Sequence, residues 1–209
     1  GSDPVMWVEG LCQYLSGHVS PMPDLPGGAP ARFMDREIRS GEGWSERLGE
    51  VLASCRVFVP LFSPRYFASE MCGKEWYAFA QRAIYHHAKS IRPAEAIVPA
   101  LWVPMPPEQL PGPAERLQFN HRAFGDRYVT DGLYGLIKLR IFAEEYEAAV
   151  YELAKRIVSV ADAYLVTILN WTQAVPAIDL AKWPAIKAYY DRMRQRPSVM
   201  KAGGEELTL

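Results

Sequence analysis

Short apolar runs in the first half of the chain, rich in β-branched and aromatic residues, predict three strands. The stretches between these runs carry apolar residues three or four positions apart, which predicts helices. Strands that alternate with helices are typical of an α/β fold with a parallel sheet. The predicted strands are residues 31–38, 56–62 and 96–103, and the predicted helices between them are residues 44–54 and 70–89.

The C-terminal part of the chain has a helical pattern only. Apolar residues step by three or four over residues 141–171, and this periodicity alone predicts one long helix. Within that stretch, Ser159 and Asp162 have the S-x-x-D spacing of a capping box, which would start a new helix at Ser159. Both alternatives remain open from the sequence. A further helix is predicted over residues 183–195, with Pro184 in its first turn.

The charge balance changes the range of partners that we expect. The chain has 209 residues, of which 49% are hydrophobic and 22% are charged, so a packed core is expected. Its 23 basic and 24 acidic residues give a net charge of −1, without the positive field of a nonspecific nucleic-acid binder. No apolar run reaches the roughly 20 residues that span a bilayer. Neither nucleic acid nor a membrane is therefore an expected partner.

The cysteines and histidines do not have the spacing of metal ligands. Cys12, Cys55 and Cys72 are odd in number and form no CxxC pair, which predicts a reducing, cytoplasmic environment. His86 and His87 are adjacent, so they would point about 100° apart on a helix and would not act as a chelating i, i+4 pair. We therefore expect no metal site and no bound cofactor.

The stretch from Ser63 to Trp76 is the most informative for chemistry. It follows the carboxyl end of a predicted strand, where ligands of parallel α/β folds bind. On the predicted helix, Glu75 lies about 60° from the centre of the apolar stripe. A carboxylate at the boundary between core and solvent is a candidate for chemistry. The alternative is a solvated surface group that is paired with Lys74 or Arg82.

One set of residues in this half of the chain has the order and spacing of a known family. The set consists of Asp35, Ile38, Gly41, Trp44, Leu52, Ser54, Ser63, Tyr66, Ser69, Cys72 and Glu75. In this set the chain resembles TIR domains, of the type found in actinobacterial TIR-like proteins, over residues 31–90 and more thinly over residues 5–158. The resemblance implies a flavodoxin-like parallel sheet. Its first strand is expected to be missing, because the chain opens at residues 3–7 with what looks like the helix that follows that strand.

The resemblance also implies an activity in signalling or defence. In TIR domains that cleave NAD⁺, the glutamate three residues after the cysteine of this helix is catalytic, and the matching residue is Glu75. Scission of the nicotinamide–ribose bond needs a carboxylate near the oxocarbenium-like ribose, and NAD⁺ would be the substrate. The family's stacking aromatic is replaced by Met71. The candidate substrate-binding residues are Trp44, Ser63, Tyr66, Cys72 and Trp76.

A glycine-rich segment offers an alternative function without catalysis. It looks like the BB loop through which TIR domains associate, so it predicts self-association and a protein–protein interaction module. An ordinary glycine-rich turn is the other interpretation, since glycine tolerates a positive φ. The segment consists of Arg39, Ser40, Gly41, Glu42 and Gly43.

Residues 159–209 resemble a second family, the C-terminal helical domain of bacterial glutathione transferases. The residues that carry this likeness are the segment 159–165, Asn170-Trp171, Asp179-Leu180, Trp183-Pro184 and the segment 196–199. In that family Ser159 and Asp162 would be a helix cap. Transferase activity is not expected, because no thioredoxin-like domain is present. We thus predict two domains, residues 1–158 and 159–209, and a chimera without activity of its own is a third hypothesis.

Overall fold

The computed structural model describes residues 4–19, 55–87, 96–117, 119–171, 179–196 and 200. The predicted strand 31–38, the predicted helix 44–54, Trp44 and the interaction segment 39–43 lie outside the described residues. The described helices of more than five residues are α1 (Pro4–Val19), α4 (Glu70–His87), α6 (Asp126–Lys138), α7 (Ala143–Trp171) and α8 (Pro184–Arg194). Shorter helical segments are α3 (Pro64–Ala68), α5 (Gly112–Glu115) and the 3₁₀ turns Pro107–Gln109, His121–Phe124, Arg140–Phe142 and Leu180–Lys182.

Two short parallel strands lie at the centre. Strand β1 (Leu61–Phe62) pairs with β2 (Ala100–Leu101), and a bridge between Phe58 and Ile97 extends the ladder. Both lie inside the predicted strands 56–62 and 96–103. Pro99 is accommodated because the ladder uses the amides on either side of it, at positions 98 and 100.

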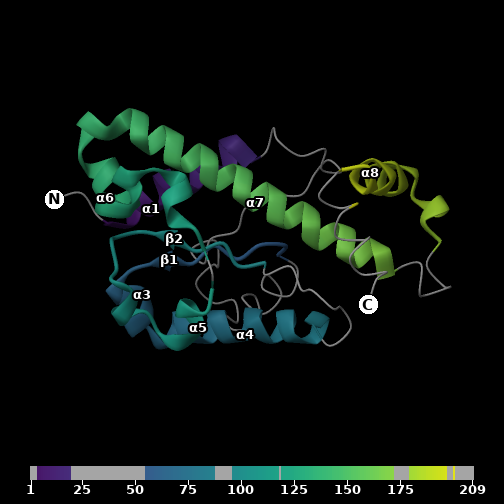
Figure 1. Cartoon of the computed structure of the whole chain (residues 1–209), viewed down its shortest axis with the longest axis horizontal. Coiled ribbons are helices and arrows are strands. Elements are labelled where there is room, and N and C mark those ends of the chain that lie inside the picture. The colour runs from purple at the N-terminus through teal and green to yellow at the C-terminus, as the bar shows by residue number, and fades with distance from the viewer. Residues whose placement is uncertain are drawn as a thin grey trace, which may run out of the picture.

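Helices cover both faces of this strand pair. Figure 1 shows α1, α6 and α7 on one side of the strands and α3, α4 and α5 on the other. One hydrophobic core joins these layers and contains Leu11, Phe62, Phe79, Leu133 and Val150, each at most 2% exposed. The layered arrangement agrees with the predicted α/β class, although the described chain is mostly helical. The flavodoxin-like strand order and the missing first strand stay predictions.

Helix α7 settles the alternative that the sequence left open. It is continuous from Ala143 to Trp171, so Ser159 and Asp162 lie inside the helix and do not stand at a helix start. The expected helix start at Ser159 is therefore corrected. The reason is burial, because Leu153 and Val160 continue the buried stripe in phase on either side of Ser159. The predicted domain boundary at residue 158 falls within this helix and stays a prediction.

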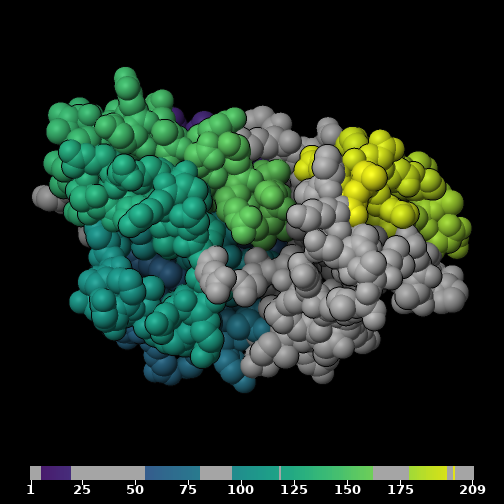
Figure 2. Space-filling view, in the orientation of Figure 1, coloured from purple at the N-terminus to yellow at the C-terminus, as the bar shows by residue number. Residues whose placement is uncertain are grey.

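Two other predicted helices are confirmed with nearly the expected bounds. The helix predicted over 70–89 is α4, and the one predicted over 183–195 is α8, which begins at Pro184. Helix α8 has its own small cluster of buried Tyr189, Tyr190 and Met193. It contacts α7 and lies at the opposite end of the molecule from α6 (Figure 2).

Helix α6 covers the edge of β2 that faces away from β1. The Tyr128 hydroxyl accepts a hydrogen bond from the Leu101 amide at 2.8 Å. The Tyr134 amide donates to the Trp102 carbonyl at 2.9 Å. The Leu101 amide, which points away from β1, is thus satisfied by a side chain of a helix.

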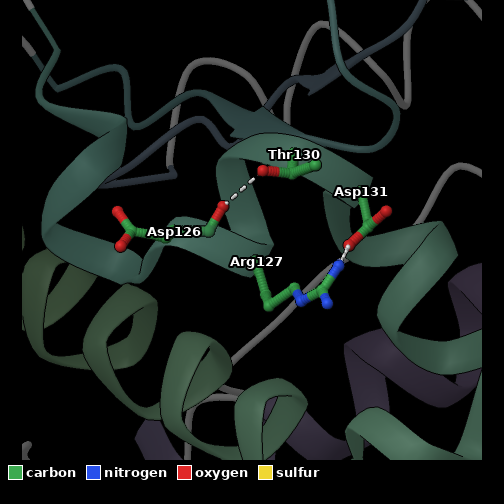
Figure 3. A network of polar contacts seen from close by, with 4 residues as sticks. All are labelled: Asp126, Arg127, Thr130 and Asp131. Atoms are coloured by element: carbon green, nitrogen blue, oxygen red, sulfur yellow. Dashed lines mark hydrogen bonds and ion pairs between the residues drawn. The ribbon is translucent and has the colours of Figure 1, made fainter.

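The close approach of α6 to β2 depends on a kink at Gly132. Its backbone has φ 66° and ψ 172°, a conformation that an L side chain rarely adopts. A Cβ atom at this position would lie 2.7 Å from the Trp102 carbonyl oxygen. The helical turns before the kink are held by a 3.3 Å ion pair between Arg127 and Asp131, seen with the Thr130 hydroxyl bond to the Asp126 carbonyl in Figure 3.

Candidate active site

A chain of hydrogen bonds with a spacing of three residues organises the turn after β1. The Ser63 hydroxyl caps α3 by accepting from the Tyr66 amide at 3.1 Å. The Tyr66 carbonyl accepts from the Ser69 amide at 3.2 Å, and the Ser69 hydroxyl accepts from the Cys72 amide at 3.3 Å. Because each cap satisfies an amide at a helix start, the turn is tied to the first turn of α4. Glu75 stands three residues further along this helix.

Tyr66 places a buried hydroxyl beside the acidic side chains of α4. Its ring contacts those of Phe62 and Phe67, with centroid distances of 6.4 and 5.3 Å. The hydroxyl is buried without a hydrogen-bond partner among the described residues. Burial raises the pKa of Tyr66, and the negative charges of Cys72 and Glu75 raise this pKa further. Tyr66 is therefore a permanent hydrogen-bond donor at neutral pH, close to Cys72 and Glu75.

The two glutamates of α4 differ in their surroundings. Glu75 is half-buried, which agrees with its predicted position at the rim of the apolar stripe. Glu70 in the first turn is exposed and forms an ion pair with Lys74 at 2.7 Å, which lowers the pKa of Glu70. Lys74, one of the two cations that the sequence offered to Glu75, thus forms its ion pair with Glu70.

Cys72 and Trp76 lie on the same part of α4 as Glu75, and both are half-buried. The Trp76 ring contacts those of Phe58 and Phe62, with centroid distances of 6.4 and 6.1 Å. These contacts are typical of core packing. The structure therefore brings Ser63, Tyr66, Cys72, Glu75 and Trp76 to one corner of the fold, and their binding roles stay predictions.

Sequence reasoning missed a polar pair, His121 and Tyr128, that is largely buried. The Nδ1 atom of His121 lies 3.4 Å from the Tyr128 hydroxyl oxygen. Burial lowers the pKa of His121 to about 4, so this imidazole is neutral at neutral pH. Its ring also contacts Phe62 at a centroid distance of 6.4 Å. No local pattern marks this pair, because its burial comes from residues distant in sequence.

The described residues contain no cluster of three or more histidine, cysteine, aspartate or glutamate side chains that could hold a metal ion. Among the helices that the structure describes, none combines the length and apolar character needed to cross a bilayer.

A family model of the TIR domain matches residues 2–128, more than half of the chain. The chain belongs to the TIR domain family. The match includes the turn after β1, helix α4 and β2, and therefore every described residue of the candidate site. Neither a curated protein nor a solved structure matches the chain significantly.

A second family model, the C-terminal domain of glutathione S-transferases, matches residues 138–197. The predicted order of the two parts is thus confirmed, with the TIR domain first. The second match includes the whole of α7, whose residues Ala149, Val150 and Leu153 are buried in the same core as the TIR strands. The glutathione-transferase-like segment therefore contributes directly to the core of the TIR domain.

Proposed function

We propose that this TIR domain cleaves the bond between nicotinamide and ribose in NAD⁺, with Glu75 as the catalytic carboxylate. Family membership supports a role in signalling or defence, and the proposal assigns a reaction within that role. The observation that carries it is the half-buried position of Glu75 on α4, whose first turn is capped by the Ser69 hydroxyl in the turn after β1.

The chemistry requires little beyond a well-placed carboxylate. As the glycosidic bond breaks, positive charge develops on the ribose, and a nearby carboxylate stabilises this oxocarbenium-like state. Nicotinamide is a good leaving group because it is cationic in NAD⁺ and departs neutral. A partly desolvated carboxylate stabilises the developing charge more strongly than one in bulk water. Half-buried Glu75 suits this task better than Glu70, which is exposed to solvent.

Nicotinamide release from NAD⁺ tests the proposal. The full chain is incubated with NAD⁺ at high protein concentration, and Glu75→Gln is compared with Glu70→Gln. Both variants replace a glutamate of α4 by its isosteric amide. We expect Glu75→Gln to reduce the rate at least about 100-fold, in line with the loss of an essential electrostatic group, and Glu70→Gln to change it less than about twofold.

The same assay distinguishes catalysis by Glu75 from the alternative of a noncatalytic interaction module. Equal release from the unaltered chain and from Glu75→Gln would reject catalysis by Glu75. A noncatalytic interaction module, which the sequence predicts through residues 39–43, would then be the better description. TIR domains often self-associate, so the assay is repeated over a range of protein concentrations. A specific rate that rises with concentration would show that assembly promotes the reaction.

A further inference from the structure

His121 lies at the carboxyl end of both strands, where ligands of parallel α/β folds bind. Its ring contacts the ring of Phe62, the last residue of β1, at a centroid distance of 6.4 Å. Its Nδ1 atom lies 3.4 Å from the hydroxyl oxygen of Tyr128. That hydroxyl accepts a hydrogen bond from the amide of Leu101, the last residue of β2. The histidine is thus connected to the end of each strand.

The hydrogen bonds of Tyr128 fix which imidazole nitrogen of His121 carries the proton. The Tyr128 hydroxyl accepts from the Leu101 amide, so its own proton needs a separate acceptor. The acceptor that the described residues offer is Nδ1 of His121. Nδ1 then carries no proton, and the proton of the neutral ring is on Nε2. The ring is neutral because burial lowers the pKa of His121 to about 4.

The Nε2–H group of His121 is left for a ligand. No described residue accepts a hydrogen bond from it, and the side chain is half-buried. The rings of Phe62, Phe119 and Tyr128 lie around the imidazole, at centroid distances of 6.4, 4.8 and 6.0 Å. Aromatic surroundings with one polar donor suit a flat ring that carries a polar substituent. We therefore expect the ligand group to be a heterocycle with a carbonyl oxygen.

This donor lies near the proposed catalytic carboxylate. The Phe62 ring that contacts His121 also contacts the ring of Trp76, the residue after Glu75 on α4, at a centroid distance of 6.1 Å. Two parts of NAD⁺ flank the ribose that is cleaved, the cationic nicotinamide ring and the pyrophosphate. A neutral imidazole does not repel the cationic ring, whereas a negatively charged pyrophosphate is better bound by a cation. Nicotinamide is therefore the part that suits His121.

Resting on the proposed function, which places the ribose of NAD⁺ at Glu75, we propose that His121 is a further catalytic residue. Its Nε2–H group donates a hydrogen bond to the carboxamide oxygen of nicotinamide. When the bond between the ribose carbon and the ring nitrogen breaks, its electron pair passes to that nitrogen. The hydrogen bond stabilises this change by drawing electron density towards the carboxamide. His121 loses no proton, and the water that adds to the ribose releases one proton to solvent.

NMR of protein with ¹⁵N-labelled histidine tests the contact without turnover. The Glu75→Gln variant is used, because we expect NAD⁺ to remain intact in it, and the His121 signals are assigned with His121→Leu. In the free protein, the proton of His121 should be on Nε2. The Nε2 signal should move when NAD⁺ or nicotinamide alone is added. ADP-ribose, which lacks nicotinamide, should leave this signal in place.

Nicotinamide release tests the contribution to catalysis. His121→Leu removes the donor and should lower kcat/KM about tenfold, the usual effect of one lost hydrogen bond. His121→Gln restores a donor near the position of Nε2 and should recover part of this loss. His18→Leu is the matched control, since His18 is also half-buried and contacts the rings of Tyr14 and Tyr151. Helix α1, which carries it, lies on the side of the strands away from α4 (Figure 1), so release should be unchanged.

The outcomes separate this inference from the proposed function. A proton on Nδ1 in the free protein, or an Nε2 signal that nicotinamide does not move, would overturn the role of His121. An equal response to ADP-ribose, or an unchanged kcat/KM in His121→Leu, would overturn it as well. Equal release from the unaltered chain and from Glu75→Gln would instead reject the proposed function, and the NMR measurements would still decide whether His121 binds nicotinamide.

Discussion

Two tyrosines on opposite sides of the strand pair have buried hydroxyls that differ in their hydrogen bonds. Tyr128 on α6 accepts a hydrogen bond from Leu101 and lies beside His121, so its hydroxyl completes the edge of β2. Tyr66 follows β1, and its hydroxyl has no partner among the residues that the structure describes. The Tyr66 ring contacts Phe62 directly, whereas the Tyr128 ring contacts His121, which in turn contacts Phe62.

The bonded hydroxyl of Tyr128 and the unbonded hydroxyl of Tyr66 illustrate a structural and a functional use of a buried polar group. At the β2–α6 contact, a side-chain hydroxyl and a backbone amide from α6 satisfy backbone groups of residues 101 and 102. Such a fully satisfied arrangement stabilises a fold. At the β1–α4 corner, the backbone is equally well capped but one donor remains available beside two acidic side chains. Available donors of this kind are expected where a ligand or catalytic group completes the bonding.

The largest effect should come from Gly132, which allows α6 to approach β2. Gly132→Ala should destabilise the protein by at least about 3 kcal/mol, because its backbone is strained for any L side chain and the added Cβ meets the Trp102 carbonyl at 2.7 Å. Gly10→Ala on α1 is the control. No atom lies within 4 Å of its added Cβ, so it should stabilise the helix by about 0.5–1 kcal/mol.

Urea-induced unfolding followed by circular dichroism measures both changes. If Gly132→Ala were as stable as the unaltered chain, the close contact between α6 and β2 would be wrong. The structural role of the Tyr128 hydroxyl, which depends on that contact, would then be unsupported.

The next largest effect should be a dependence of the free energy of unfolding on pH, caused by His121. The folded pKa is about 4 and the unfolded value is about 6.5, so the unfolded chain binds the proton first as the pH falls. The contribution of this neutral imidazole to folding stability is complete above pH 6.5 and is lost as the pH falls towards 4. Over this pH range, we expect the free energy of unfolding to fall by about 2 kcal/mol more in the unaltered chain than in His121→Gln. This value is reduced because His121 is partly in contact with solvent.

Urea unfolding at several pH values between 7 and 4 gives this difference directly. Parallel curves for the two proteins would mean that His121 is not buried against Tyr128 in its neutral form. The β2–α6 contact would then be less protected from water than the distances indicate.

These expectations also show which parts of the molecule could be predicted from the sequence. Helix α4, the first residue of α8 and the two paired strands follow from local signals, namely helical periodicity, a proline in a first turn and short apolar runs. The position of Glu75 at the rim also follows from helical spacing. Residues grouped within fifteen positions along the chain, such as Ser63 and Glu75, are brought together by one turn and one helix.

The features that escaped prediction depend on contacts between distant segments. Nothing near Gly132 reveals that the Trp102 carbonyl approaches it, and nothing near Tyr66 reveals that its hydroxyl is left without a partner. The S-x-x-D pattern at Ser159 failed for the same reason. Burial of Leu153 and Val160 in a shared core favours a continuous helix over the local cap.

The smallest effects on stability should come from removing the two tyrosine hydroxyls, and the ratio of the two effects tests most directly whether the hydroxyls differ in use. Tyr128→Phe leaves the buried Leu101 amide without an acceptor and should cost about 1.5 kcal/mol. Tyr66→Phe should change stability by less than about 0.5 kcal/mol, since the Tyr66 hydroxyl has no hydrogen bond to lose among the described residues. Urea unfolding gives both values, and amide hydrogen exchange should show lost protection at Leu101 in Tyr128→Phe alone. Equal costs for the two variants would mean that the Tyr66 hydroxyl is a structural group like that of Tyr128.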